Sequence, residues 1–265
     1  MKINNTLCIL LTTGLLTSGL ATATDKTASV FTPEQETRIG EVSKEYLLTH
    51  PEILLEVSQK LQQQQQEQQE QAMKAAVIQH QAALTNDKGT PSFGPANAKV
   101  TVVEFFDYQC IYCARLSTEM EKVMKANPQV RFVFKEWPIF APRWENSGLA
   151  ARTGLQIWQQ KGADAYLKYH HALYATGHTG GKLTREDIEA AAKAVQFDVR
   201  TAADVQSTLD SINTLGQQLG FGGTPAVVIL PSAGARTDSI TVIPGGARAE
   251  ELQQAINKAA TSPEK

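Results

Sequence analysis

The stretch VTVVEFFDYQCIYC, residues 100–113, indicates a buried strand followed directly by two cysteines. It opens with an apolar run, Val100–Phe106, in which only two residues are polar, as expected of a strand in the middle of a sheet. It closes with Cys110 and Cys113, which stand in a C-x-x-C spacing. Such a pair can be a structural bridge, half of a metal site or a working redox pair, so the remaining sequence has to discriminate between these three.

The first residues of the chain are typical of an export signal. Lys2 supplies a positive charge, an apolar stretch runs from Leu7 to Leu20, and Ala21–Ala23 form a small-x-small cleavage site. The apolar stretch is short for a membrane span, and an uncleaved anchor is the alternative. We therefore predict a signal peptide over residues 1–23, which removes Cys8 from the mature chain.

Composition narrows the class of protein. The 265 residues suffice for one domain and an extension. After removal of the signal, Cys110 and Cys113 are the remaining cysteines, in an oxidising compartment that we expect to be the periplasm. A structural disulfide framework normally has more than one bridge, so a lone pair favours chemistry. The 25 Lys and Arg against 27 Asp and Glu give a net charge of -2, which offers no electrostatic reason to expect nucleic acid as a partner.

Residues 24–85 are predicted to form a helical stalk that joins subunits. Thr32 and Pro33 are typical of a helix start, and the helix should break at His50–Pro51 and restart there. A heptad pattern follows, but glutamine fills its middle in QKLQQQQQEQQEQ, residues 59–71. The alternative is a solvated or disordered linker. Helix-forming residues without glycine favour the stalk and a homo-oligomer, and the heptad does not choose between dimer and trimer.

The next residues, 86–98, are rich in Gly and Pro and predict a hinge linker. Residues 99–265 have an α/β pattern with a helical insertion at about 145–219. We expect strands over residues 100–106, 130–137, 224–230 and 239–246, a helix over 110–125 and a closing helix over 248–260.

The cysteine spacing fits redox chemistry. Cys110 is predicted in the first turn of its helix, where free backbone N–H groups and the helix dipole stabilise a thiolate. Cys110 would then be the nucleophile and Cys113, one turn further, the resolving thiol of a redox-active disulfide. A structural bridge across so short a loop gains little entropy, and zinc needs more ligands than the scattered histidines offer. Two thiolates can still bind Cu(I), so copper handling stays open.

Two further features belong to the candidate site. Glu104 is a charged residue in an apolar strand, and it is either solvent-facing on an edge strand or a buried carboxyl with a raised pKa that exchanges a proton with Cys113. Thr224–Pro225 follows two glycines and opens a strand. This is a candidate cis-proline whose preceding backbone could hold a peptide as an added strand, although a trans-proline is the alternative.

These segments together resemble a known family. VTVVEFFDYQCIYC and GFGGTPAVVIL, residues 220–230, are similar to the thioredoxin-like periplasmic disulfide oxidoreductases of the DsbA type. FTPEQETRIGEVSKEYLLTHPEILLEV, residues 31–57, resembles the N-terminal segment of the suppressor-of-copper-sensitivity protein C (ScsC-like) group, in which such a segment makes homo-oligomers. The resemblance implies a thioredoxin-like fold with a helical insertion. It implies Cys110 as nucleophile, Cys113 as its partner, Glu104 as buried acid and Thr224–Pro225 as the cis-proline loop.

We therefore expect a periplasmic thiol–disulfide oxidoreductase that acts on unfolded or misoxidised exported proteins, as an isomerase or an oxidase. A membrane thiol-redox partner would maintain the redox state of Cys110 and Cys113. No cofactor beyond the Cys110–Cys113 disulfide is expected. The alternative is a copper-handling protein that binds Cu(I) with the same two thiols. Ile111 and Tyr112 stand between the cysteines, where many relatives carry Pro or Gly after the first cysteine.

Overall fold

The computed structural model describes residues 30–199 and 204–261. The predicted signal peptide, residues 1–23, lies outside these ranges, and so does Cys8. The chain divides into two compact units, Met1–Gln59 and Lys60–Lys265. Within the described ranges, no helix combines the length and the apolar character needed to cross a membrane.

The described part of the first unit is helical. Helix α1, Pro33–Thr49, begins with a capping box in which the side chains of Thr32 and Gln35 each accept a hydrogen bond from the other's backbone N–H. This confirms the predicted helix start. α1 ends before His50–Pro51, because a residue that precedes proline avoids helical angles. None of the residues of α1 is buried, including its apolar face, made up of Ile39, Val42, Tyr46 and Leu47.

Helix α2, Glu52–Gln79, begins directly after the proline, and the glutamine-rich residues 59–71 are helical throughout. The glutamines of this tract are exposed, which agrees with a helix too polar to bury itself. The last turns of α2 differ, because Met73 and Val77 are buried. A short helix α3, Gln81–Thr85, follows and buries Leu84.

The second unit is built on one mixed sheet. In the order β1-β3-β2-β4-β5, its strands are β1 Ser92–Phe93, β3 Arg131–Glu136, β2 Val100–Phe106, β4 Ala226–Pro231 and β5 Thr241–Pro244. β2 is the central strand, parallel to β3 and antiparallel to β4. The four predicted strands are confirmed, with ends that shift by up to two residues. β1, which pairs with β3, was not predicted.

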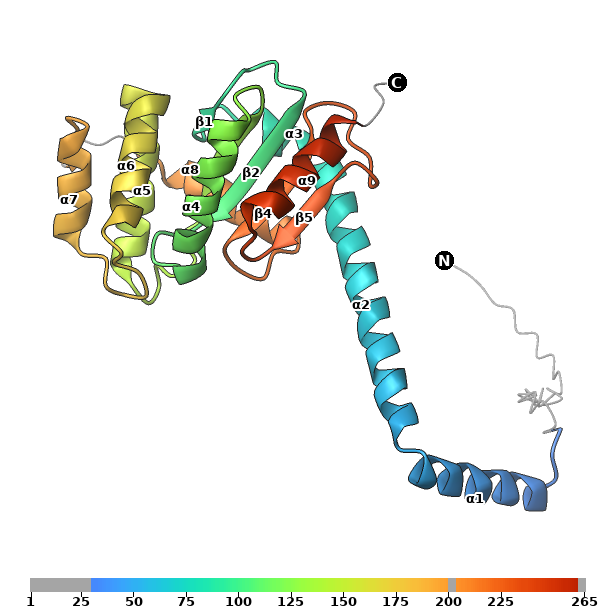
Figure 1. The fold of residues 1–265 in the computed structure, drawn as a ribbon. Helices are drawn as coiled ribbons and strands as arrows, with labels where there is room; N and C mark the ends of the chain where they lie inside the picture. The colour runs from blue at the N-terminus through green and yellow to red at the C-terminus, as the bar shows by residue number, and fades with distance from the viewer. Residues whose placement is uncertain (1–29, 200–203, 262–265) are drawn as a thin grey trace, which may run out of the picture. The chain divides into compact units, whose positions relative to one another are not determined.

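Helices cover both faces of the sheet (Figure 1). The helices after β2 are α4 Ile111–Ala126, α5 Glu145–Lys161, α6 Ala163–Ala175, α7 Arg185–Ala194, α8 Gln206–Gln218 and α9 Ala249–Ala260. One face carries α4 and α9, whose core is shared with α5, α6 and α7. The other face carries the end of α2, α3 and α8. This confirms the predicted α/β class, a thioredoxin-like fold with a helical insertion preceded by N-terminal helices.

Alternation along β2 and β3 sorts side chains onto the two faces. Val102 and Phe106 lie in the core beneath α4, whereas Val103 and Phe105 lie in the core that the end of α2 covers. Glu104 has the parity of Val102 and Phe106, so its carboxyl belongs to the face that carries α4. The fold thus directs one charged side chain of the central strand toward the cysteines.

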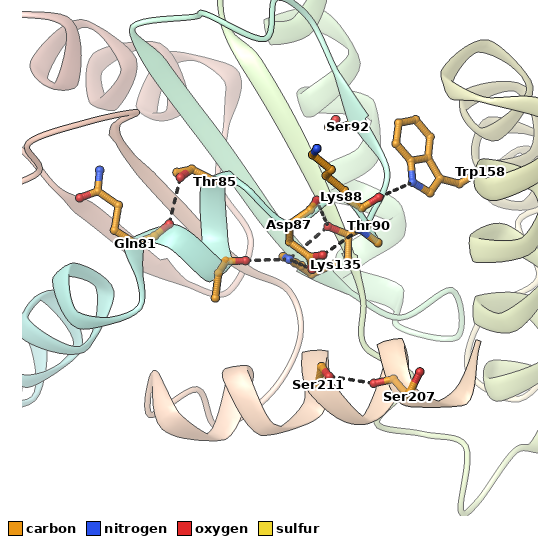
Figure 2. Close-up of polar contacts among 12 residues, drawn as sticks. Gln81, Thr85, Asp87, Lys88, Thr90, Ser92, Lys135, Trp158, Ser207 and Ser211 are labelled. Carbon is orange, nitrogen blue, oxygen red and sulfur yellow. Dashed lines mark hydrogen bonds and ion pairs between the residues drawn. The ribbon is translucent and has the colours of Figure 1, made fainter. Parts of the chain in front are cut away.

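A buried lysine ties residues 86–98 to the sheet (Figure 2). The Nζ atom of Lys135, on β3, lies 2.7 Å from Oδ2 of Asp87, 3.0 Å from the carbonyl oxygen of Ala83 and 3.1 Å from Oγ1 of Thr90. A fully buried ammonium group needs such partners, because desolvating it without them is costly. The segment that we predicted as a hinge linker therefore contributes an ion pair and strand β1 to the second unit.

Candidate functional site

Cys110 lies at the junction between the central strand and the helix that follows it. β2 ends at Phe106, a three-residue loop follows, and Cys110 is the N-cap of α4. Its backbone N–H donates to the carbonyl oxygen of Asp107 at 3.0 Å, which closes the turn. Both cysteines are free thiols, and both are buried, Cys110 at 4% exposure and Cys113 at 0%. The expectation that Cys113 is the less exposed of the two is confirmed.

The surroundings of Cys110 favour its thiolate. The pKa of this thiol is lowered from 9.0 to about 6, first by a hydrogen bond that the Cys113 thiol donates, against the opposing effect of burial. The backbone N–H groups of Cys113 and Tyr112 lower it further. The sequence argument assigned this role to backbone amides and the helix dipole. The neighbouring thiol is instead the largest stabilising contribution.

Cys113 has the opposite character. Burial raises its pKa well above the ordinary thiol value, and its hydrogen bond to Cys110 and the charges of Cys110 and Glu104 raise it further. The two thiols therefore differ strongly in proton affinity, although only two residues separate them. At neutral pH the thiolate form of Cys110 is therefore favoured, whereas Cys113 keeps its proton.

Glu104 is the candidate acceptor for the proton of the Cys113 thiol. It lies on the central strand β2 between β3 and β4, so the edge-strand alternative is wrong. Both carboxyl oxygens are buried and have no hydrogen-bond partner among residues 30–199 and 204–261. Burial, and then the charge of Cys110, raise its pKa from 4.5 to about 8. A carboxyl with this pKa can both accept and return a proton near neutral pH.

The Thr224–Pro225 peptide bond is cis, which confirms the candidate proline. The loop brings the carbonyl oxygen of Thr224 to 3.3 Å from the Cys110 sulfur, and the protonated form of Cys110 donates a hydrogen bond to it. We expected a backbone free to hold a peptide, but in this protonated form the thiol occupies that oxygen. Gly222 and Gly223 have open space where a side chain would stand, so an extended polypeptide can approach the loop closely.

A second buried carboxyl lies on the same face and was missed from the sequence. Oε1 of Glu136, on β3, accepts hydrogen bonds from the hydroxyls of Tyr108 and Tyr166, each at 2.9 Å. A Cβ atom at Gly154 would stand 2.5 Å from this oxygen, so α5 needs glycine there to admit the carboxyl. Burial raises the pKa of Glu136 well above its ordinary value. Two charged residues, Lys135 and Glu136, follow the apolar residues of the predicted strand VRFVFKEW, and this pattern could have indicated a buried carboxyl.

The loop before Cys110 is fixed from several sides. Asp107 accepts hydrogen bonds from the backbone N–H of Gln109 at 2.8 Å, from that of Phe140 at 2.9 Å and from the Ser147 hydroxyl at 2.7 Å. Gln109 in turn accepts from the N–H groups of Gly180 and Gly181 through its backbone and side-chain oxygens, at 2.8 and 2.9 Å. The helical insertion therefore forms a wall beside the nucleophile, a role that the sequence did not reveal.

The structure offers no sign of a larger metal site. Among the described residues, no group of three or more His, Cys, Asp or Glu side chains is arranged to hold a metal ion. His170 is buried among aromatic rings, and burial lowers its pKa from 6.5 to about 3, so it is a neutral core side chain. The two thiols remain the candidate soft-metal ligands.

Comparisons with known proteins identify the family of the chain. Residues 86–230, more than half of the chain, match the thioredoxin family, and residues 35–68 match the copper resistance protein ScsC N-terminal domain. No protein with a curated description matches the chain. BcfH of Salmonella enterica Typhimurium is similar over 86% of this chain and 96% of its own, with 42% identity and a TM-score of 0.76.

Two other solved structures are similar over a shorter range. A thioredoxin-like oxidoreductase from Silicibacter pomeroyi DSS-3 has 33% identity and a TM-score of 0.57, covering 69% of this chain and 98% of that one. A periplasmic thioredoxin-like protein from Salmonella enterica serovar Typhimurium has 28% identity and a TM-score of 0.56, covering 68% of this chain and 95% of that one.

The substitution Glu104→Gln should raise stability and slow the exchange chemistry. The folded-state pKa of Glu104, about 8, exceeds its ordinary value of 4.5, so the native protein loses stability as pH rises through this window. Without the ionisable group, the variant should be more stable than the parent at pH 8 by a few kcal/mol, and the gain should vanish near pH 4.5. Attack by Cys113 on a mixed disulfide should slow roughly tenfold or more, because its proton acceptor is gone.

Urea unfolding at several pH values and single-turnover exchange kinetics measure both effects. Glu121→Gln is the matched control on α4, because Lys125 lowers the pKa of Glu121 and the pH trend should not appear. A constant stability difference between pH 5 and pH 8 would contradict the assigned role of Glu104.

Proposed function

Because the chain belongs to the thioredoxin family and carries an ScsC N-terminal domain, we propose that it is a thiol–disulfide oxidoreductase that works through Cys110 and Cys113. One observation carries this proposal: the pKa of Cys110 is about 6, whereas the pKa of its neighbour Cys113 lies well above the ordinary thiol value. Two thiols with a purely structural role do not require different pKa values. In thiol–disulfide exchange, one thiol must be ionised to attack while the other stays protonated, so the difference is required.

The exchange follows from the two proton affinities. The Cys110 thiolate attacks one sulfur of a substrate disulfide, the substrate S–S bond breaks, and the other substrate sulfur leaves as a thiolate. Cys113 then gives its proton to Glu104 and attacks the Cys110 sulfur. The mixed disulfide breaks, the substrate leaves reduced, and Cys110–Cys113 becomes the disulfide. Run backwards, the same steps oxidise a substrate dithiol. In isomerisation, the freed substrate thiolate attacks the mixed disulfide before Cys113 does.

The substrates that we propose are unfolded or misoxidised exported proteins in the periplasm. The predicted signal peptide over residues 1–23 supports export, and one similar structure is a periplasmic protein. The open space at Gly222 and Gly223 supports a polypeptide substrate, which can lie along the Thr224–Pro225 loop. A membrane thiol-redox partner would return Cys110 and Cys113 to their working state.

We further propose that the chain is a homo-oligomer, a dimer or a trimer, joined through its N-terminal helices. The apolar face of α1 supports this, because Ile39, Val42, Tyr46 and Leu47 are all exposed in the single chain. Leu54, Val57 and Leu61 continue the exposed apolar set into α2. Such a set of large apolar side chains is normally covered by a partner, and the match to the ScsC N-terminal domain lies over the same residues.

An oligomer favours isomerisation over oxidation, because several active sites then act on one bound substrate. We expect the reduced full-length protein to be oligomeric by light scattering and to unscramble a multi-disulfide substrate. The double variant Ile39→Glu/Val42→Glu should be monomeric and should lose isomerase activity by roughly tenfold or more, while Cys110 keeps its reactivity toward a small disulfide.

Lys44→Gln, a change at an exposed polar residue of α1, is the control and should behave as the parent protein. Equal unscrambling by the monomeric variant would contradict the link between assembly and isomerisation. Oxidation without any unscrambling by the parent protein would leave an oxidase instead of an isomerase.

A second candidate function is Cu(I) binding by the same two thiols. Two observations favour it: the hydrogen-bonded sulfurs of Cys110 and Cys113 are both available as ligands, and the N-terminal family is described as a copper resistance domain. The reduced protein should then bind one Cu(I) per chain in competition with a chelator, and Cys110→Ser should abolish this. Weak binding that survives Cys110→Ser would remove copper handling as a function.

A further inference from the structure

A groove lies beside the nucleophile and has no role in the exchange steps above. It has a volume of about 400 Å³ and runs between α4 and the start of α9. The side chains that line it are Tyr112, Arg115, Leu116 and Glu119 from α4, with Ala247, Arg248 and Glu251 from the other wall. Tyr112 follows Cys110 by two residues, so a polypeptide that reacts at Cys110 has this groove within reach.

The groove lining contains two arginines and two glutamates. Arg115 and Arg248 are both exposed, and neither forms an ion pair with a carboxylate in the described ranges. The guanidinium of Arg115 lies over the ring of Tyr112, 5.5 Å from its centroid. Such stacking holds a cation in place without neutralising it.

The carboxylates of the groove do not compensate for both arginines. Oε1 of Glu119 lies 2.6 Å from the Lys122 ammonium, and Oε2 accepts a hydrogen bond from the backbone N–H of Ala249 at 3.0 Å. Both oxygens of Glu119 therefore already have hydrogen-bond partners. The Lys122 hydrogen bond lowers the pKa of this carboxylate most, and the charge of Arg248 also acts on it and helps to lower its pKa. Glu251 remains as the carboxylate of the lining without an assigned partner among the described residues, against two guanidinium groups.

The groove wall next to Cys110 is exposed. Tyr112, which lines the groove, is 61% exposed, which is unusual for a large aromatic side chain next to a buried reactive centre. Gly246, at the far wall, has no atom within 4 Å of the place where a Cβ would stand. Tyr112 therefore offers an exposed contact surface between Cys110 and the groove.

We propose that this groove binds an acidic side chain of the substrate polypeptide, a few residues from its reacting cysteine, between Arg115 and Arg248. The inference rests on the proposed function and adds a substrate class to it: exported polypeptides with Asp or Glu near a cysteine. Arginine suits this role because its planar fork of N–H donors matches a carboxylate. Because both arginines are exposed, the preference should be moderate and should weaken with added salt.

Paired peptides give a direct test on the oxidised full-length protein. Each pair contains one cysteine and differs only in an Asp or an Asn two, three or four residues from it, on either side. The peptide thiolate attacks the Cys110 sulfur, the Cys110–Cys113 bond breaks, and Cys113 leaves and takes up a proton. The measured quantity is the ratio of the two second-order rate constants, Asp over Asn.

For at least one position, the parent protein should react about fivefold faster with the Asp peptide at low salt, as about 1 kcal/mol of pairing would give. In Arg115→Gln/Arg248→Gln this ratio should fall close to one. Intrinsic differences between the two peptide thiols cancel, because the same pair is used with both proteins. Lys125→Gln is the matched control, since this cation of α4 lies outside the groove lining, and it should keep the parent ratio.

An equal rate for Asp and Asn peptides at every position would overturn the inference while leaving the exchange function intact. So would a preference that persists unchanged in the double arginine variant. Failure of every peptide to react at Cys110 is a different result, because it would overturn the proposed function and the groove inference together.

Discussion

The hydrogen bond between the two cysteine sulfurs is the interaction on which the proposed chemistry of this protein depends. Cys113 is fully buried, so its proton is held tightly, and that proton is shared with the Cys110 sulfur one helical turn away. The same contact lowers the pKa of one thiol and raises that of the other. Two identical side chains thereby differ in proton affinity, as the proposed nucleophile and resolving thiol require.

The sheet positions the other residues of the candidate site. The alternation of side chains along each strand and the order of the strands decide where these residues lie. The central position of β2 buries Glu104 on the face that carries α4. The end of β2 leads into the loop that Asp107 and Gln109 fix. The loop before β4 brings the Thr224 carbonyl oxygen to the Cys110 sulfur. The opposite face carries Lys135 and its partner Asp87, so the charge that anchors residues 86–98 is kept away from the thiolate.

Much of this arrangement could be predicted from the sequence, because the signals were local. The apolar run Val100–Phe106, the C-x-x-C spacing and the proline after two glycines are each local patterns. Their order indicates an α/β fold, and their resemblance to a known family implies the thioredoxin-like fold. Glu104 stood out as one charge inside an apolar strand. Its burial follows from its place on the central strand.

Contacts between distant segments could not be predicted in this way. Strand β1 has only two residues and is defined by its pairing with β3, which is distant in the sequence. Through this pairing, part of a Gly- and Pro-rich segment belongs to the sheet. Glu136 depends on Tyr108, Tyr166 and the space at Gly154, which come from three different elements. The largest influence on Cys110 was assigned to backbone amides, because helix position can be inferred from sequence, whereas the direction of the Cys113 thiol cannot.

Titration of the thiolate ultraviolet absorbance of the reduced protein tests this account most directly. The account predicts a midpoint at about pH 6 for Cys110 and a clear alkaline shift of that midpoint in Cys113→Ala, which lacks the donating thiol. A parent midpoint near the ordinary thiol value of 9.0, or one that Cys113→Ala leaves unchanged, would contradict it.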